Sequence, residues 1–183
     1  ATYPKDEIKK DLFDKIGLKV VFSYSLDNAV KAGVVAPYKI KVIELTLDDK
    51  EKYIKAGSKE KPFLTTEFGQ YNYLNTIMQK ILYSGKDAPA WLFLKRMHFI
   101  YNLKSKTKVA KSIIEQIPKD ERTLIFCGSI EQATELCPHR FHSKTDDKDL
   151  TSFCKEKINQ LACVNALNEG MNIPNLDNAV IVR

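Results

Sequence analysis

The sequence lacks the features of membrane, secreted and repetitive proteins. No apolar run approaches the roughly 18 residues of a membrane helix, and the longest are short pieces such as Trp91–Leu94. The chain of 183 residues has four cysteines, too few for a disulfide framework, and four acidic residues within its first 20 positions argue against a signal peptide. It has no internal repeat and no low-complexity tract. We therefore expect a cytoplasmic protein, bacterial or in the host cytoplasm if viral, with no membrane partner.

Two nucleotide-binding motifs and the common catalytic groupings are absent as well. Neither a GxxxxGK[ST] phosphate loop nor a GxGxxG turn occurs, so the chain cannot hold a triphosphate or a dinucleotide by either device. No Ser-His-Asp or Cys-His grouping can be assembled. Cys137, His139, His142 and Cys154 carry atoms that could bind zinc, but their spacing is not that of a closed zinc site. We expect packed thiols and surface histidines there, with no metal ligands.

What the sequence does contain is an ordinary globular composition with a positive charge. Hydrophobic residues make up 44% and charged residues 28%, and 29 basic against 23 acidic residues give a net charge of +6. This excess is compatible with a phosphate-bearing partner but does not require one. The chain starts at Ala1 and ends at Arg183 directly after an apolar run, and we expect it to be part of a longer protein.

Helices and strands alternate in the first quarter of the chain. The patterns predict a helix over 6–16, a strand over 18–24, a helix over 26–32 and a strand over 38–47. Ser25 is the expected N-cap of the second helix. The last strand is predicted because apolar Tyr38, Ile40 and Val42 alternate with lysines.

The next stretch, about 48–104, has a different character. Its apolar residues recur at helical spacing, and we expect a helical insertion into a sheet protein. It holds ten of the chain's 18 aromatic residues: Tyr53, Phe63, Phe68, Tyr71, Tyr73, Tyr83, Trp91, Phe93, Phe99 and Tyr101. We expect these side chains to form a small core of their own. The alternative is a stacking platform or a wedge for separated nucleic-acid strands.

From residue 105 the pattern becomes β-α-β. The predicted elements are a helix over 106–117, a strand over 123–127, a helix over 130–137, a short extended piece at 141–143, a helix marked by Leu150, Phe153, Cys154, Ile158 and Leu161, and strands over 161–166 and 178–182. Strands that alternate with helices of this length predict a parallel sheet with right-handed crossovers. The expected fold class is α/β.

Two segments could bind a ligand. The first is TLIFCGSIEQ (123–132), in which a buried strand delivers Gly128 and Ser129 to the start of a helix, where free backbone N–H groups could face an anion. Taken by itself, the segment is better explained as an ordinary β-α junction. The second is 161–183, where a strand runs into Asn165 and a polar turn containing Gly170 and Asn172. Glycine allows close approach of the backbone to a ligand, and asparagine offers a short donor and acceptor.

Read in order, the motifs resemble those of the second RecA-like motor domain of superfamily 2 (DEAD/DEAH-type) helicases, nearest the DNA-repair and phage recombination group. The matching pieces are Ala1-Thr2 (the end of the Ser/Thr-Ala-Thr motif), Tyr24-Ser25-Leu26 with Ala36-Pro37-Tyr38, Leu124–Ser129 (motif IV), His142–Thr145 (a backbone-contacting motif) and Val164–Pro174 (motif V, EGxNxP). The resemblance covers almost the whole chain and is weakest over 48–104.

The resemblance implies a P-loop NTPase helicase C-terminal domain, with a RecA-like parallel sheet flanked by helices. Residues 1–16 would connect to an absent first motor domain, and 17–183 would form the second domain with its insertion. The full-length protein would be an ATP-dependent helicase using ATP and Mg²⁺, with nucleic acid, DNA in preference to RNA, as partner. Nucleic-acid contacts would come from Gly128, Ser129, His142, Ser143, Lys144, Thr145, Asn165 and Ala166. Glu169, Gly170 and Asn172 would face ATP.

The chain also departs from the family pattern. The phosphate loop, the DExx box and the QxxGRxxR motif are missing, so the resemblance implies no catalytic residue here and no ATPase activity for this chain alone. Val164 stands where many relatives have Thr, and Asn172 where many have Asp.

Four lysines could add to a nucleic-acid footprint or form a solvated helix face: Lys104, Lys106, Lys108 and Lys111. The alternatives to the motor domain are a non-catalytic basic α/β module that binds nucleic acid or protein, and a metal or thiol enzyme.

Overall fold

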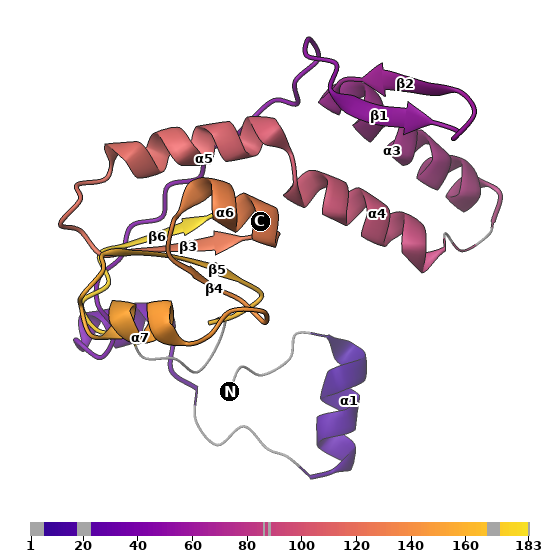
Figure 1. Ribbon diagram of the computed structural model, residues 1–183. Coiled ribbons are helices and arrows are strands. Elements are labelled where there is room, and N and C mark those ends of the chain that lie inside the picture. The colour runs from indigo at the N-terminus through magenta and orange to yellow at the C-terminus, as the bar shows by residue number, and fades with distance from the viewer. Residues whose placement is uncertain (1–5, 18–22, 86, 88, 168–172, 183) are drawn as a thin grey trace. The chain divides into compact units, whose positions relative to one another are not determined.

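The computed structural model describes residues 6–17, 23–85, 87, 89–167 and 173–182 (Figure 1). Its chain divides into two compact units, Ala1–Ile43 and Glu44–Arg183, and each is described by itself. No helix in the described part combines the length and apolar character that a membrane crossing requires.

The first unit contains the two predicted helices, α1 (Glu7–Lys15) and α2 (Leu26–Lys31). Ser25 caps α2 as expected, since its side chain accepts a hydrogen bond from Asn28 N. Gly33, at φ +70°, follows the end of this helix. The strand expected over 18–24 lies mostly outside the described residues, and Ser23 and Tyr24 are not in a strand.

The strand predicted over 38–47 is wrong. Residues 36–48 form no regular element, and Ile40 and Val42 are 75% and 80% exposed. Alternation of apolar and polar residues makes a strand possible, but a strand forms only when a neighbouring backbone takes up its N–H and C=O groups. No described strand pairs with this segment.

The second unit is built on a four-stranded parallel sheet in the order β4-β5-β3-β6. Its strands are β3 (Thr123–Cys127), β4 (Arg140–Phe141), β5 (Gln160–Val164) and β6 (Asn178–Ile181), and its helices are α5 (Lys104–Gln116), α6 (Ile130–Leu136) and α7 (Lys148–Cys154). The α/β class and the parallel arrangement are therefore as predicted. Helix α7 ends before Ile158 and Leu161, which the sequence pattern had placed on the same helix.

The two faces of the sheet carry separate apolar cores. Ile125 and Cys127 of β3 pack with Ala110 and Ile114 of α5 and with residues of α6, whereas Leu124 packs with Phe153 of α7 on the other face. Helices α5 and α6 thus cover one side of the sheet and α7 the other (Figure 1). The central strand β3 is buried on both faces, which explains why every residue after Thr123 in it is apolar.

Residues 48–103 are only partly helical. Helices α3 (Glu67–Tyr83) and α4 (Ala90–Tyr101) pack on each other as expected, but an antiparallel hairpin, β1 (Ile54–Gly57) and β2 (Pro62–Thr65), precedes them. Gly57, at φ +91°, lies beside the Lys61 carbonyl and has no room for a Cβ atom. Gly57 and Pro62, which the pattern treated as interruptions of helices, are the boundaries of the hairpin turn.

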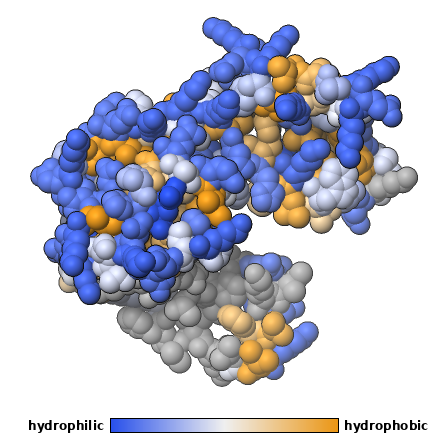
Figure 2. All heavy atoms as spheres, in the orientation of Figure 1, coloured by the Kyte–Doolittle hydropathy of each residue, from blue (hydrophilic) through white to orange (hydrophobic). Residues whose placement is uncertain are grey.

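The aromatic residues of this insert do not form the expected core. None of the ten is buried, and Trp91 and Tyr83 are 58% and 88% exposed. Apolar side chains accordingly appear on the surface of the insert (Figure 2). The buried apolar residues among the described positions of 48–103 are Leu74, Leu92 and Leu103.

A buried carboxylate, Glu67, ties the insert to the sheet region. Its oxygens accept hydrogen bonds from Tyr53 Oη, from Asp48 N, and from both the N–H and the hydroxyl of Ser105 at the start of α5. Burial alone would raise the pKa of Glu67, but the donors from Ser105, Tyr53 and Asp48 outweigh it and lower the pKa. The charged carboxylate therefore joins the hairpin, α3 and α5.

Candidate functional site

A groove with a volume of about 660 Å³ lies at the carboxyl ends of the parallel strands. Three loops line it, each following a strand: residues 128–131 after β3, 141–147 after β4, and 164–166 at the end of β5. Because the carboxyl ends of parallel strands meet at one edge of the sheet, these loops converge although they are far apart in sequence. Ligands of open α/β sheets bind at this edge.

The sequence-predicted contact residues meet in this groove with one exception. The lining includes Gly128, Ser129, His142, Ser143, Thr145, Asn165 and Ala166. Lys144 is exposed at the neighbouring turn but does not line the groove. Glu169, Gly170 and Asn172, the residues predicted to face ATP, lie outside the described residues.

The loop after β3 is held by the side chain of Gln132. Ser129 caps α6 and accepts a hydrogen bond from Gln132 N, as predicted, but Gln132 Oε1 takes the N–H of Gly128, at 2.8 Å. The N–H of Gly128 is therefore not free for an anion, contrary to the expectation. A Cβ atom on Gly128 would lie 2.8 Å from Tyr101 Cβ. Glycine is thus required by the close packing of α4 on the strand end.

The loop after β4 is a tight turn fixed by His142 and Thr145. Thr145 Oγ1 accepts from His142 N and donates to His142 O, both at 2.9 Å, and His142 Nδ1 accepts from Lys144 N. His142 is buried, whereas Ser143 is exposed and lines the groove. The hydroxyl of Thr145 is committed to the turn, so Ser143 is the side chain that can donate directly to a ligand.

The backbone after β5 adopts unusual conformations. Asn165 and Leu167 have positive φ angles of 51° and 61°. Asparagine enters this region readily because its short amide can bond locally, but leucine does so rarely. Leu167 is held there because its side chain packs on the α7 face of the sheet. The sequence gives no signal for this turn beyond Asn165.

Sequence reasoning missed Arg122, a buried guanidinium just before β3. It donates hydrogen bonds to the carbonyls of Phe153 and Pro174 and stacks over the Phe153 ring at 4.6 Å. Its backbone N–H donates to Asp177 Oδ2 at 2.7 Å. Arg122 therefore anchors the chain at 174–177 against α7. An arginine at the end of a polar stretch, Lys119–Glu121, reads as a surface residue, so no sequence signal marks it.

Three lysines of α5 are engaged with side chains outside the groove. Lys104 lies 4.1 Å above the Tyr53 ring, Lys106 lies 5.6 Å above the Tyr101 ring, and Lys108 forms an ion pair with Glu51 at 3.2 Å. Burial lowers the pKa of Lys106. The groove is lined by none of the four lysines in question, Lys104, Lys106, Lys108 and Lys111. Their position favours the interpretation that they form a solvated helix face and do not contact nucleic acid.

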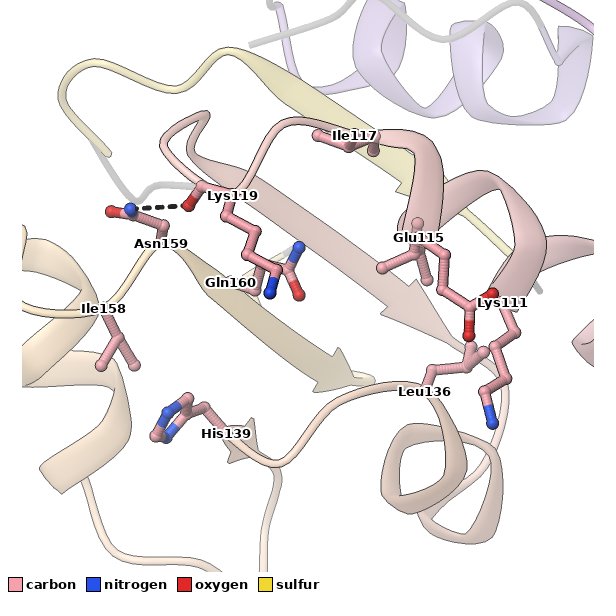
Figure 3. A pocket seen from close by; sticks show the side chains of 10 residues that line it. Lys111, Glu115, Ile117, Lys119, Leu136, His139, Ile158, Asn159 and Gln160 are labelled. Carbon is pink, nitrogen blue, oxygen red and sulfur yellow. Dashed lines mark hydrogen bonds between the residues drawn. The ribbon is translucent and has the colours of Figure 1, made fainter.

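A second pocket of about 490 Å³ lies near the amino end of β5 (Figure 3). Lys111, Glu115 and Lys119 line it together with His139 and the start of β5, and the side chain of Asn159 donates to the Lys119 carbonyl. This is the edge of the sheet opposite to the one where ligands of α/β proteins bind. We assign no function to this pocket.

The cysteines and histidines do not form a metal centre within the described residues, which include all four candidate ligands. Cys137 is buried in the apolar core beside α6, and His139 contacts Asp149 at 3.3 Å. Burial raises the pKa of Cys127 to about 12, with the neighbouring Cys163 and Cys137 adding to the effect. A thiol with so high a pKa is a poor nucleophile near neutral pH because almost none of it is ionised.

Comparison with known proteins gives no family assignment. No protein-family model matches the sequence, and no curated protein matches it.

Proposed function

We propose that this chain is the second RecA-like motor domain of a superfamily 2 helicase or translocase, and that the groove holds the phosphate backbone of one nucleic-acid strand. One observation carries the proposal. The segments that the motif resemblance assigns to strand contact, 128–129, 142–145 and 165–166, line a single groove, with the exception of Lys144, at the ligand-binding edge of a parallel α/β sheet. The sheet, covered by helices on both faces, is compatible with a RecA-like fold.

The chemistry of the groove suits contacts that position a strand without reading its bases. Ser143 offers a neutral hydroxyl, and Asn165 a side-chain amide. Glu131 and Asp147 also line the groove, and their negative charges oppose phosphate. We therefore expect moderate affinity from this chain alone.

In the full-length motor the first RecA-like domain would supply the groups that hold ATP and Mg²⁺. Glu169, Gly170 and Asn172 would complete the ATP cleft from this side. Closing and opening of the cleft would step the pair of domains along the strand. Because the phosphate loop and the DExx box are missing from the sequence, we expect this chain alone to hydrolyse no ATP.

The Ser143→Ala variant tests the groove. Binding of a fluorescein-labelled oligothymidylate of about twelve nucleotides is measured by anisotropy, with Ser112→Ala as the control, because Ser112 is exposed on α5 and lines neither pocket. Loss of one hydrogen bond to a charged phosphate, worth about 1.5–3 kcal/mol, weakens binding roughly tenfold to 150-fold in Ser143→Ala. Equal affinity of the two variants, or no binding by the unmodified chain, would contradict the proposal.

A further inference from the structure

The wall of the groove that belongs to the insert is formed by helix α4. His98 and Asn102, both exposed, line the groove together with the three loops. The end of α4 is fixed to the sheet: Gln132 Nε2 donates to the Tyr101 carbonyl at 3.1 Å, and Tyr101 packs against Gly128. The orientation of α4 relative to the groove is therefore set by direct contacts.

The same face of α4 continues away from the groove. Trp91, Lys95, His98 and Asn102 follow one another at spacings of four, three and four residues. At 100° per residue they fall within an arc of about 60°, and at 1.5 Å per residue they span about 16 Å. All four are exposed, whereas Leu92, on another face of the helix, is buried.

The chemistry of this stripe fits a single nucleic-acid strand. Trp91, 58% exposed, presents an indole on which a base can stack, and Lys95 adds a cation. Helix α4 contains no acidic residue, so nothing on it repels phosphate. Its second cation, Arg96, is already engaged with Tyr71, to whose hydroxyl it donates at 2.6 Å.

We propose that the Trp91–Lys95–His98–Asn102 stripe of α4 binds the bases and phosphates of a single strand as it leaves the groove. The inference rests on the proposed function of the groove, and it gives the insert a role in holding the strand. The exposed tryptophan is then a stacking residue, and the insert lengthens the binding site by about the 16 Å that the stripe spans.

Trp91 is the only tryptophan of the chain, so intrinsic fluorescence reports on the stripe directly. Addition of an unlabelled oligothymidylate of about twelve nucleotides is expected to quench this fluorescence. In the anisotropy assay Trp91→Ala weakens binding roughly fivefold to 150-fold, the loss of one stacked base, and Trp91→Phe retains most of the affinity. Phe93→Ala is the matched control, because Phe93 is an exposed aromatic about 160° around the same helix, and it leaves binding unchanged.

The outcomes separate this inference from the proposed function. In one outcome, Ser143→Ala weakens binding, but the oligonucleotide leaves Trp91 fluorescence unchanged and Trp91→Ala binds as tightly as the unmodified chain. This outcome overturns the role proposed for the stripe and leaves the proposed function of the groove standing. Equal losses in Trp91→Ala and Phe93→Ala overturn the stripe as well. No binding by the unmodified chain overturns both.

Discussion

The sheet region, residues 104–182, and the insert, residues 48–103, bury different kinds of side chain. In the sheet region two apolar clusters fill the space between β3, β5 and the helices on each face. In the insert a charged carboxylate, Glu67, is buried at the junction with α5, Leu74, Leu92 and Leu103 are the buried apolar residues, and most aromatic residues stay at the surface. The sheet region is therefore stabilised mainly by apolar burial, while the position of the insert depends on a polar network.

This difference bears on function. A close-packed apolar core resists small displacements of its side chains because the surrounding side chains leave no empty space. Such a core suits a sheet whose loops must hold a groove in a fixed shape. The aromatic side chains of the insert are exposed and can contact a binding partner. Exposed apolar patches of this kind mark interaction sites. The comparison can be tested by changing one residue in each region.

The largest effect is expected at Phe153. Its side chain is fully buried beneath the sheet and stacks with the Arg122 guanidinium. Phe153→Ala removes these contacts and leaves a cavity, so the free energy of unfolding falls by about 3–5 kcal/mol. Urea denaturation followed by circular dichroism measures the change. A loss below about 1 kcal/mol would mean that the α7 face contributes little to the core.

The sheet region was predictable because its signals are local. The wholly apolar run at 123–127 gave β3 with its observed bounds, and Ser129 was recognised as the cap of α6. The grouping of 128–129, 142–145 and 165–166 came from the motif resemblance, and all of these residues except Lys144 line one groove because parallel strands carry their loops to one edge. These features depend on burial and capping, which short stretches of sequence record.

The failures have a common physical origin in partners that lie far away in the chain. Whether 38–47 becomes a strand depends on a paired backbone, and the alternation of Tyr38, Ile40 and Val42 carries no information about one. Arg122 was missed because its carbonyl partners are supplied by Phe153 and Pro174. The role of Gly128 was misread because the packing of Tyr101 from α4 was not foreseeable from the strand itself.

A smaller effect, with a pH dependence, is expected at Glu67. Glu67→Gln removes the charge that four donors share, and hydrogen bonds to charged groups contribute about 1.5–3 kcal/mol. We expect a loss of about 2 kcal/mol at pH 7. Hydrogen exchange is expected to increase first in 48–103, because Glu67 joins the insert to α5, whereas Phe153→Ala loosens the sheet region.

The sign of the pH dependence follows from the lowered pKa of Glu67. Because the folded-state pKa lies below the ordinary glutamate value of 4.5, the carboxylate stabilises the protein fully above that pH, and this contribution is lost as the pH falls through the folded-state pKa. The difference in stability between the unmodified chain and Glu67→Gln is therefore largest near neutral pH and shrinks in acid. A difference that grows as the pH falls would contradict this account.

The smallest effect on stability is expected at Trp91, which separates a surface role of the insert aromatics from a core role. Trp91 is 58% exposed, and its neighbour Leu92 is 1% exposed. Trp91→Ala changes the free energy of unfolding by no more than about 0.5 kcal/mol, as is usual for surface substitutions, whereas Leu92→Ala lowers it by about 2–5 kcal/mol. Both variants are unfolded in urea under the same conditions. A loss of about 3 kcal/mol or more in Trp91→Ala would place the indole in a core, and the stacking surface on α4 would then have to be abandoned.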